Sequence, residues 1–144
     1  MKILKGLFTL IVVGILLAAL TYFVGKPLLS DWQMKDNYQV AQAGRLGDGS
    51  CKVKYGLFVL CDISIESQLP TETVSKTGYY FFVDFGGGDY SVRVIEDKSN
   101  PTNISAQFAQ DKLINRLISF VVVFGLFFLG IIGALKILFG RAPA

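Results

Sequence analysis

The sequence predicts a membrane protein of the α+β class, in which two transmembrane helices flank a small extracytoplasmic antiparallel β domain. Two observations lead to this class. The chain of 144 residues contains two long stretches without any charged residue, at positions 6–25 and 117–135. The segment between them is polar, with alternating apolar residues and glycine-containing turns, which is typical of about two β-hairpins with a short amphipathic helix.

Each uncharged stretch is long enough to cross a bilayer. At about 1.5 Å per residue, stretches of 20 and 19 residues each span roughly 30 Å, the thickness of the hydrocarbon core. Backbone amides in lipid must be satisfied within the segment, so both stretches are expected to be helical. We therefore expect a cytoplasmic N-terminal tail (1–5), transmembrane helix 1 (6–25), an extracytoplasmic domain (26–116), transmembrane helix 2 (117–140) and a cytoplasmic C-terminal tail (141–144).

The first stretch also resembles a secretory signal peptide, because Lys2 and Lys5 stand near its start. Its apolar region is longer than the usual 7–15 residues or so, and no A-x-A cleavage box follows it. Bulky residues occupy the end of the stretch instead, at Tyr22, Phe23 and Val24. We expect the segment to be retained as a membrane anchor.

The distribution of charge fits this arrangement. All 11 acidic residues lie at positions 26–116, together with 10 of the 14 Lys and Arg, and both tails carry only basic residues. Basic flanks favour the cytoplasm, which places both termini inside and the central domain outside. The net charge of +3 therefore reflects membrane topology and not nucleic-acid binding. We expect a bacterial inner-membrane protein with a periplasmic domain.

A short amphipathic helix is expected after the first span. Residues 25–27, Gly-Lys-Pro, predict a break, because proline removes a helical hydrogen-bond donor. Ser30 with Gln33 three residues later matches a capping box, and Gly44 marks a helix end. The segment RLGDGS at residues 45–50 is then expected to be a loop.

The segment CKVKYGLFVLCDISIES predicts a β-hairpin that turns at residues 55–57. This register sets Cys51 opposite Cys61 and gathers the apolar residues on one face, whereas a slip of one residue would exchange the two faces. Opposed residues have a Cα separation suited to a disulfide, and an outward-facing domain favours oxidation. The alternative is a pair of free cysteines buried in the core.

A second hairpin is expected in TGYYFFVDFGGGDYSVRV. A four-residue turn at positions 86–89 sets Phe81 opposite Val94. One face is then wholly apolar and forms the core face; it consists of Tyr79, Phe81, Val83, Phe85, Tyr90, Val92 and Val94. The opposite face carries two aromatic residues, an arginine and an isoleucine among polar residues.

That opposite face requires a cover. Either the helix beginning at Ser30 packs on it, or a partner outside the chain does. Exposed aromatic and arginine side chains are enriched in protein interfaces. The candidate partner contacts are therefore Tyr80, Phe82, Arg93 and Ile95.

The sequence offers no recognisable reactive centre. It has no histidine, the commonest general base and a common metal ligand. The glycine triplet lacks the Lys-Ser/Thr of a phosphate-binding loop and lies between predicted strands. No Ser-x-x-Lys or Gly-x-Ser-x-Gly motif occurs, and neither span contains an ionisable residue for a proton or ion path. We expect no enzymatic activity, no cofactor and no catalytic or metal site.

Small residues recur at helical spacing within both spans. Gly14 and Ala18 share one face of the first span, and Gly130, Gly133 and Ala134 lie close together on the second. Small-xxx-small faces let helices approach closely. The alternative is that glycine is simply frequent in membrane helices.

These observations predict a non-enzymatic accessory, structural or assembly subunit of an integral membrane complex. Its expected partners are the lipid bilayer and other integral membrane subunits or copies of itself, with no nucleic acid. Two alternatives remain: a self-associating protein or ligand sensor with an extracytoplasmic domain, and an envelope thiol redox protein that uses Cys51 and Cys61.

Overall fold

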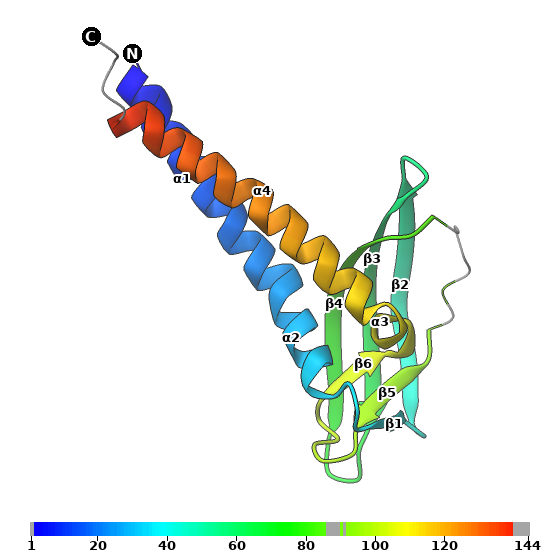
Figure 1. The fold of residues 1–144 in the computed structure, drawn as a ribbon. Helices are drawn as coiled ribbons and strands as arrows, with labels where there is room; N and C mark the ends of the chain where they lie inside the picture. The colour runs from blue at the N-terminus through cyan, green and yellow to red at the C-terminus, as the bar shows by residue number, and fades with distance from the viewer. Residues whose placement is uncertain (1, 86–89, 91, 140–144) are drawn as a thin grey trace.

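Two long helices lie side by side and carry a sheet domain at one end (Figure 1). The computed structural model describes residues 2–85, 90 and 92–139. Helix α1 (Lys2–Leu20) and helix α4 (Leu113–Phe139) run in opposite directions, so that their outer ends lie together. The prediction of two apolar helices flanking an antiparallel sheet domain is confirmed.

Both helical segments are long and apolar enough to cross a membrane. The candidate spans are Leu4–Gln33 and Leu113–Lys136, with mean hydropathies of 2.6 and 2.7 in their most apolar windows. Of those windows, 0% of the first and 11% of the second is buried within the chain. The apolar side chains of both helices therefore face outward and not into a core.

The first helix does not break at Pro27. A π-helical turn, η1 (Thr21–Gly25), joins α1 directly to α2 (Lys26–Gln33), and Pro27 lies in the first turn of α2. Proline is tolerated in a first turn, and a π-helical turn is a site where a helix changes its hydrogen-bond pattern. The N-terminal helix consequently reaches the sheet domain without interruption.

The prediction of a helix from Ser30 to Gly44 is wrong. Ser30 belongs to the end of α2, and the chain then turns into strand β1 (Tyr38–Val40). The Ser30 hydroxyl donates a hydrogen bond to Asn103 Oδ1 at 2.6 Å and does not cap a new helix. A contact with a residue distant in sequence has replaced the local one that the capping box predicted.

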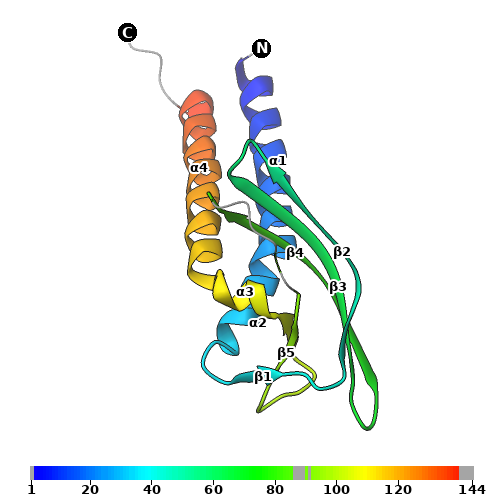
Figure 2. The ribbon, with the colours of Figure 1, turned by 90° about the vertical axis from the view of Figure 1, so that its right-hand side faces the viewer.

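The strands of the described residues form two antiparallel sheets of three strands each (Figures 1 and 2). The large sheet has the order β2-β3-β4, with bounds Gly44–Lys54, Phe58–Gln68 and Thr73–Val83. The small sheet has the order β1-β5-β6, in which β5 is Val94–Asp97 and β6 is Ile104–Ala106. A short helix, α3 (Gln107–Asp111), leads from β6 to α4.

The hairpin of β2 and β3 has the predicted register. Cys51 pairs with Cys61, and a disulfide joins them with their Cα atoms 4.0 Å apart. Closing a loop this short contributes about 2–3 kcal/mol. The predicted loop at residues 45–50 is wrong, because these residues extend β2 beside β3, with a β-bulge between Leu46 and Asp48.

The second predicted hairpin is wrong. β4 pairs with β3, so that Tyr80 lies opposite Cys61, and β5 pairs with β1 and β6. The predicted turn at residues 86–89 lies outside the described residues. In the observed register the apolar face of β3 continues onto Tyr80 and Phe82, which reverses the predicted faces of β4.

The core lies between the inner face of the large sheet, the small sheet and α3. Tyr80 and Phe82 are fully buried there, and Phe108 of α3 packs against both rings. Tyr90 packs edge-on against Phe82 at a ring-centroid distance of 5.5 Å. The face of β4 that carries Tyr80 and Phe82 is therefore covered by other parts of the chain.

Candidate functional site

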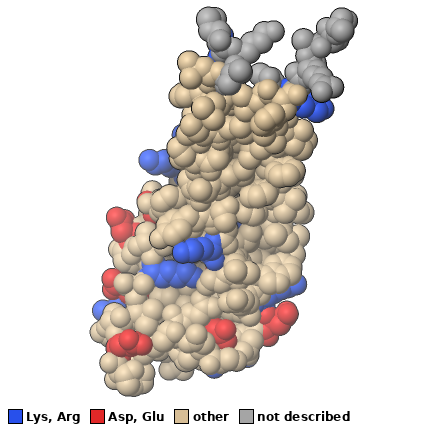
Figure 3. Space-filling model, turned by 90° about the vertical axis from the view of Figure 1, so that its left-hand side faces the viewer, with Lys and Arg blue, Asp and Glu red and all other residues tan. Residues whose placement is uncertain are grey.

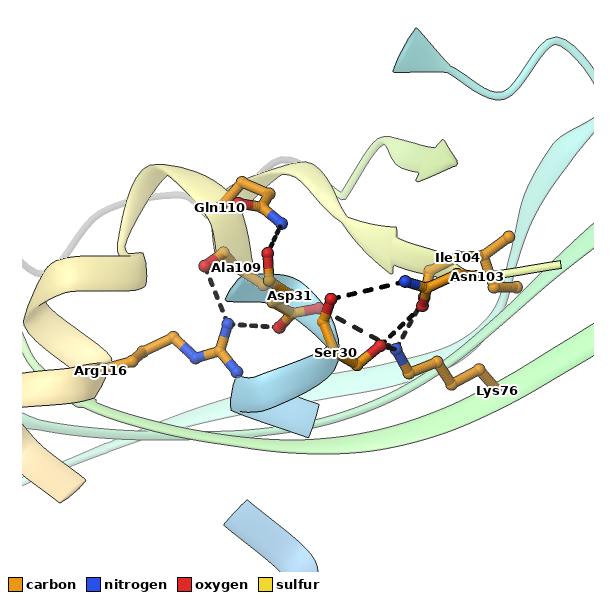
Figure 4. Close-up of polar contacts among 8 residues, drawn as sticks. All are labelled: Ser30, Asp31, Lys76, Asn103, Ile104, Ala109, Gln110 and Arg116. Carbon is orange, nitrogen blue, oxygen red and sulfur yellow. Dashed lines mark hydrogen bonds and ion pairs between the residues drawn. The ribbon is translucent and has the colours of Figure 1, made fainter. Parts of the chain in front are cut away.

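A buried polar junction connects both long helices to the sheet domain (Figure 4). We define this junction by its six polar side chains, which come from α2, β4, α4 and the segment around α3: Ser30, Asp31, Lys76, Asn103, Gln110 and Arg116. It sits where the helices meet the domain, so its contacts fix how the two parts are oriented.

The centre of the junction is an ion pair between Asp31 and Arg116. Arg116 Nη1 lies 2.6 Å from Asp31 Oδ2, and the two side chains are 1% and 0% exposed. Arg116 Nη1 also donates to the backbone carbonyl of Ala109 at 2.8 Å. The pair therefore ties the end of α2 directly to the start of α4.

Lys76 of β4 is a second cation beside the same carboxylate. Its Nζ lies 3.9 Å from Asp31 Oδ1 and donates to Ser30 Oγ at 3.0 Å and to the carbonyl of Ile104 at 2.8 Å. Burial lowers the pKa of Lys76 from its ordinary 10.5; the Asp31 carboxylate opposes this shift and Arg116 adds to it. Two cations thus share one buried anion.

Backbone carbonyls of α2 also accept hydrogen bonds from the junction. Gln110 Nε2 donates to the carbonyl of Asp31 at 2.6 Å, and Asn103 Nδ2 donates to that of Ser30 at 3.5 Å. Carbonyls at the end of a helix have no partner within the helix, so these amides satisfy groups that would otherwise be left open. α2 is thereby fixed to α3 and to the loop before β6.

Tyr80 connects the junction to the core. The guanidinium carbon of Arg116 lies 4.8 Å from the centroid of the Tyr80 ring, within range of a cation–π interaction. Burial raises the pKa of Tyr80 to about 12, and the nearby Asp31 carboxylate adds to this effect. The neutral phenol is therefore strongly favoured in the folded chain.

A second polar contact ends the large sheet at α4. Asn115 Nδ2 donates to the carbonyl of Val83 at 2.5 Å, and its Oδ1 accepts the backbone N–H of Val83 at 3.2 Å. The side-chain amide of α4 thus satisfies both backbone groups at the last residue of β4, where another strand would otherwise pair.

The proposed partner contacts are mostly inaccessible. Tyr80, Phe82 and Ile95 are at most 1% exposed, and this corrects their assignment to an outer surface. For Tyr80 and Phe82 the error follows from the register of β4, which turns them toward the core, and Ile95 is buried in the small sheet, where β5 pairs with β1 and β6. Arg93 is exposed, and its carbonyl accepts a hydrogen bond from the backbone of Gln107.

The small residues of the helices lie mostly on their outer surface. A Cβ added at Gly14, Gly130 or Gly133 would meet nothing within 4 Å, and Ala18 is exposed. Ala134 is buried. The close approaches occur at glycines that had not been singled out: a Cβ at Gly6 would lie 2.8 Å from Leu138, and one at Gly25 would lie 3.4 Å from Phe120.

Sequence reasoning also missed the junction. Asp31 and Arg116 are single charges 85 positions apart, and no motif joins them. The available signal was their position: Asp31 follows the first uncharged stretch, Arg116 directly precedes the second, and their charges are opposite.

Comparisons with known proteins give no relative for this chain. No protein-family model matches it, and no curated protein or solved structure gives a significant match. Within the described residues there is also no group of three or more His, Cys, Asp or Glu that could hold a metal ion.

Proposed function

We propose that this chain is a non-enzymatic accessory or assembly subunit of an integral membrane complex. In this proposal α1 and α4 span a bacterial inner membrane, the termini lie in the cytoplasm and the sheet domain lies in the periplasm. The observation that carries it is the buried Asp31–Arg116 pair, which joins the ends of both helices to one domain. A rigid connection of this kind suits a part whose role is to hold partners in a fixed arrangement.

The outward-facing surface of the helices supports membrane insertion. Phe8 is 68% exposed, Leu126 64% and Phe128 53%, and other large apolar side chains on both helices are similarly open. On the face drawn in Figure 3, the surface of the helices carries no acidic side chain, and the acidic side chains lie on the sheet domain. An apolar surface this extensive would not remain in water, and lipid is the natural cover.

Retention of the first helix is supported by its packing. α1 lies along α4 with close approaches at Gly6 and Gly25, and its continuation α2 supplies Asp31 to the junction. Removal of α1 and η1 would uncover the side of α4 that carries Leu138 and Phe120, which these two glycines face. A segment so integrated behaves as an anchor.

The disulfide supports the outward location of the domain. Such bonds persist in oxidising compartments such as the periplasm and are rare in the cytosol. Cys61 is 2% exposed and belongs to the core, whereas Cys51 of β2 is exposed. The two cysteines pair across β2 and β3 and do not lie at a helix N-terminus, where the reactive thiols of redox enzymes are activated, which favours a structural role.

The test is purification in a mild detergent, followed by identification of every polypeptide that accompanies the chain. We expect stoichiometric integral membrane partners. Gly130→Leu should release them, because it fills an outer face that is open in this chain, while Val121→Leu, on an exposed side chain, should retain them. Recovery of further copies of this chain alone would favour self-association, and a lone monomer under every mild condition would contradict the proposal.

A further inference from the structure

An apolar groove lies between the large sheet and α4. Its volume is about 600 Å³, within the range of sites that hold small apolar ligands. Phe58 and Phe81 form one wall, with their rings stacked at 6.1 Å, and Ile114, Ile118 and Val122 of α4 form the other.

The α4 wall of the groove continues into the predicted membrane span. Its lining residues run from Asp111 to Val123, and the uncharged stretch begins at position 117. Ile118 is 58% exposed and Val122 is 56% exposed, so the groove merges with the lipid-facing surface of the helix. An acyl chain could enter it from the bilayer without crossing a polar barrier.

The outer face of the large sheet changes character along its length. Toward the β2–β3 turn it presents Lys52 and Lys54 beside Leu60 and Phe58. Farther from the turn the outward-facing residues of β3 are polar or acidic: Asp62, Ser64 and Glu66. In Figure 2 the turn points along the helices, toward their outer ends. The basic and apolar half is thus the half nearest the proposed membrane.

The turn itself carries an exposed aromatic residue in a strained conformation. Tyr55 has φ = 55° and is 91% exposed, and Gly56 follows with φ = 72°. A bulky residue rarely adopts positive φ, and here the tight turn between β2 and β3 imposes it and holds the side chain outward. Tyrosine is a residue that membrane proteins place at the lipid–water interface.

We propose that this groove holds one acyl chain of a bilayer phospholipid, with the phosphate of that lipid held by Lys52 and Lys54. The assignment rests on the proposed membrane insertion of α4. It follows from the apolar lining, from the opening onto the span and from the two lysines of β2 beyond the Phe58 wall, where Lys54 is paired with Phe58; the lysines lie outside the lining itself, whose one charged residue is Asp111. Lys112, near the other wall, is already paired with Asp84 at 3.0 Å, which leaves the lysines of β2 as the phosphate ligands.

The test uses tryptophan reporters in a Trp32→Phe background, which removes the single native tryptophan. Phe81→Trp reports from the groove, Thr73→Trp from the exposed far end of the same strand and Phe128→Trp from the proposed span. The full chain is reconstituted in vesicles of phosphatidylcholine and phosphatidylglycerol with bromine atoms on the acyl chains. Where Phe81→Trp does not fold, Phe58→Trp on the same wall replaces it.

We expect brominated chains to quench the Phe81→Trp and Phe128→Trp reporters and to leave the fluorescence of the Thr73→Trp reporter unchanged. Quenching at Phe128→Trp without quenching in the groove would overturn this inference and leave the membrane proposal standing. Absence of quenching at Phe128→Trp would overturn both, because it would show that α4 is outside the bilayer.

A separate measurement tests the contact between the lysines and the phosphate. Preferential quenching of the groove reporter by brominated phosphatidylglycerol over phosphatidylcholine should fall by about fivefold for each lysine removed in Lys52→Gln and Lys54→Gln. Lys98→Gln, an exposed lysine near the small sheet, should leave the preference unchanged. An unchanged preference in the double variant would exclude these lysines as the phosphate ligands.

Discussion

Replacing Arg116 by methionine should destabilise the chain strongly, because it leaves the Asp31 carboxylate buried without its closest partner. Both side chains are almost fully buried, and their atoms lie 2.6 Å apart. Removal of one member of such a pair costs about 3–5 kcal/mol. The Ala109 carbonyl loses a hydrogen bond as well, worth about 1 kcal/mol. Lys76, at 3.9 Å, compensates in part, so we expect a total loss of about 3–5 kcal/mol.

The double variant Asp31→Leu/Arg116→Met separates pairing from simple loss of contacts. With both charges replaced by apolar groups, the loss should shrink to about 1–2 kcal/mol, because neither Asp31 nor Arg116 is left buried without the other. The remaining loss comes from Lys76, which no longer faces a carboxylate but keeps its hydrogen bonds to Ser30 and to the Ile104 carbonyl. The free energy of unfolding can be measured by denaturant titration in detergent, with fluorescence of Trp32, which is next to Asp31 in α2. Lys98→Met serves as a matched exposed control and should change stability by less than about 0.5 kcal/mol.

Two results would refute this reasoning. One is an Arg116→Met variant that loses less than about 1 kcal/mol, which would mean that water or Lys76 solvates Asp31 fully. The other is a double variant as unstable as the single one, which would assign the loss to packing and not to an orphaned charge.

Three further predictions concern the domain. Replacing Cys51 and Cys61 together by alanine should lower the free energy of unfolding by about 2–3 kcal/mol in denaturant titration, and equal stability with and without the bond would contradict a structural role. Gly78→Ala should cost about 1–3 kcal/mol in the same assay, because the new Cβ would lie 2.7 Å from the buried Tyr80 hydroxyl, whereas Gly14→Ala has open space and should be tolerated. Between about pH 10 and about pH 12 stability should fall, since the unfolded phenol of Tyr80 ionises first and binds fewer protons than the folded one. Tyr80→Phe removes this ionisation, and thermal unfolding measures stability in both chains. An equal loss of stability at alkaline pH in the two chains would exclude Tyr80 as its source.

The parts of the fold with unambiguous local patterns could be predicted from the sequence. The absence of charge over 20 and 19 residues leaves helices as the natural interpretation in lipid. The register of Cys51 and Cys61 followed because residues 51–54 and 61–66 alternate between apolar and polar and the turn between the strands is short.

The second hairpin could not be predicted, because its first strand is apolar at consecutive positions and the period of two does not choose a face. In the structure β4 makes side-chain contacts on both faces, although Tyr79 on the outer face is 47% exposed. Tyr80 and Phe82 face Phe108 in the core, while Tyr79 contacts Phe23 of η1 at 5.8 Å and Phe81 lines the groove against α4. The answer depended on helices that lie far away in sequence.

The junction was hidden for a related reason. A lone aspartate in a polar helix end and a lone arginine before a hydrophobic stretch are both ordinary on a protein surface. Their burial arises only when α2 and α4 converge on the same edge of the sheet domain. Ser30 shows the same limit, because its capping pattern was local while its actual partner, Asn103, lies 73 positions away.

Asn115 has a consequence for how copies of this chain can associate. By occupying the backbone of Val83, it blocks strand addition where β4 meets α4. Among the described residues β2 pairs only with β3, yet its bulge after Leu46 and its lysines at positions 52 and 54 discourage an incoming strand. A large sheet whose edges resist strand addition is protected from edge-to-edge aggregation, even at high local concentration. Any ordered assembly must then be specified by the helices or by the faces of the sheets.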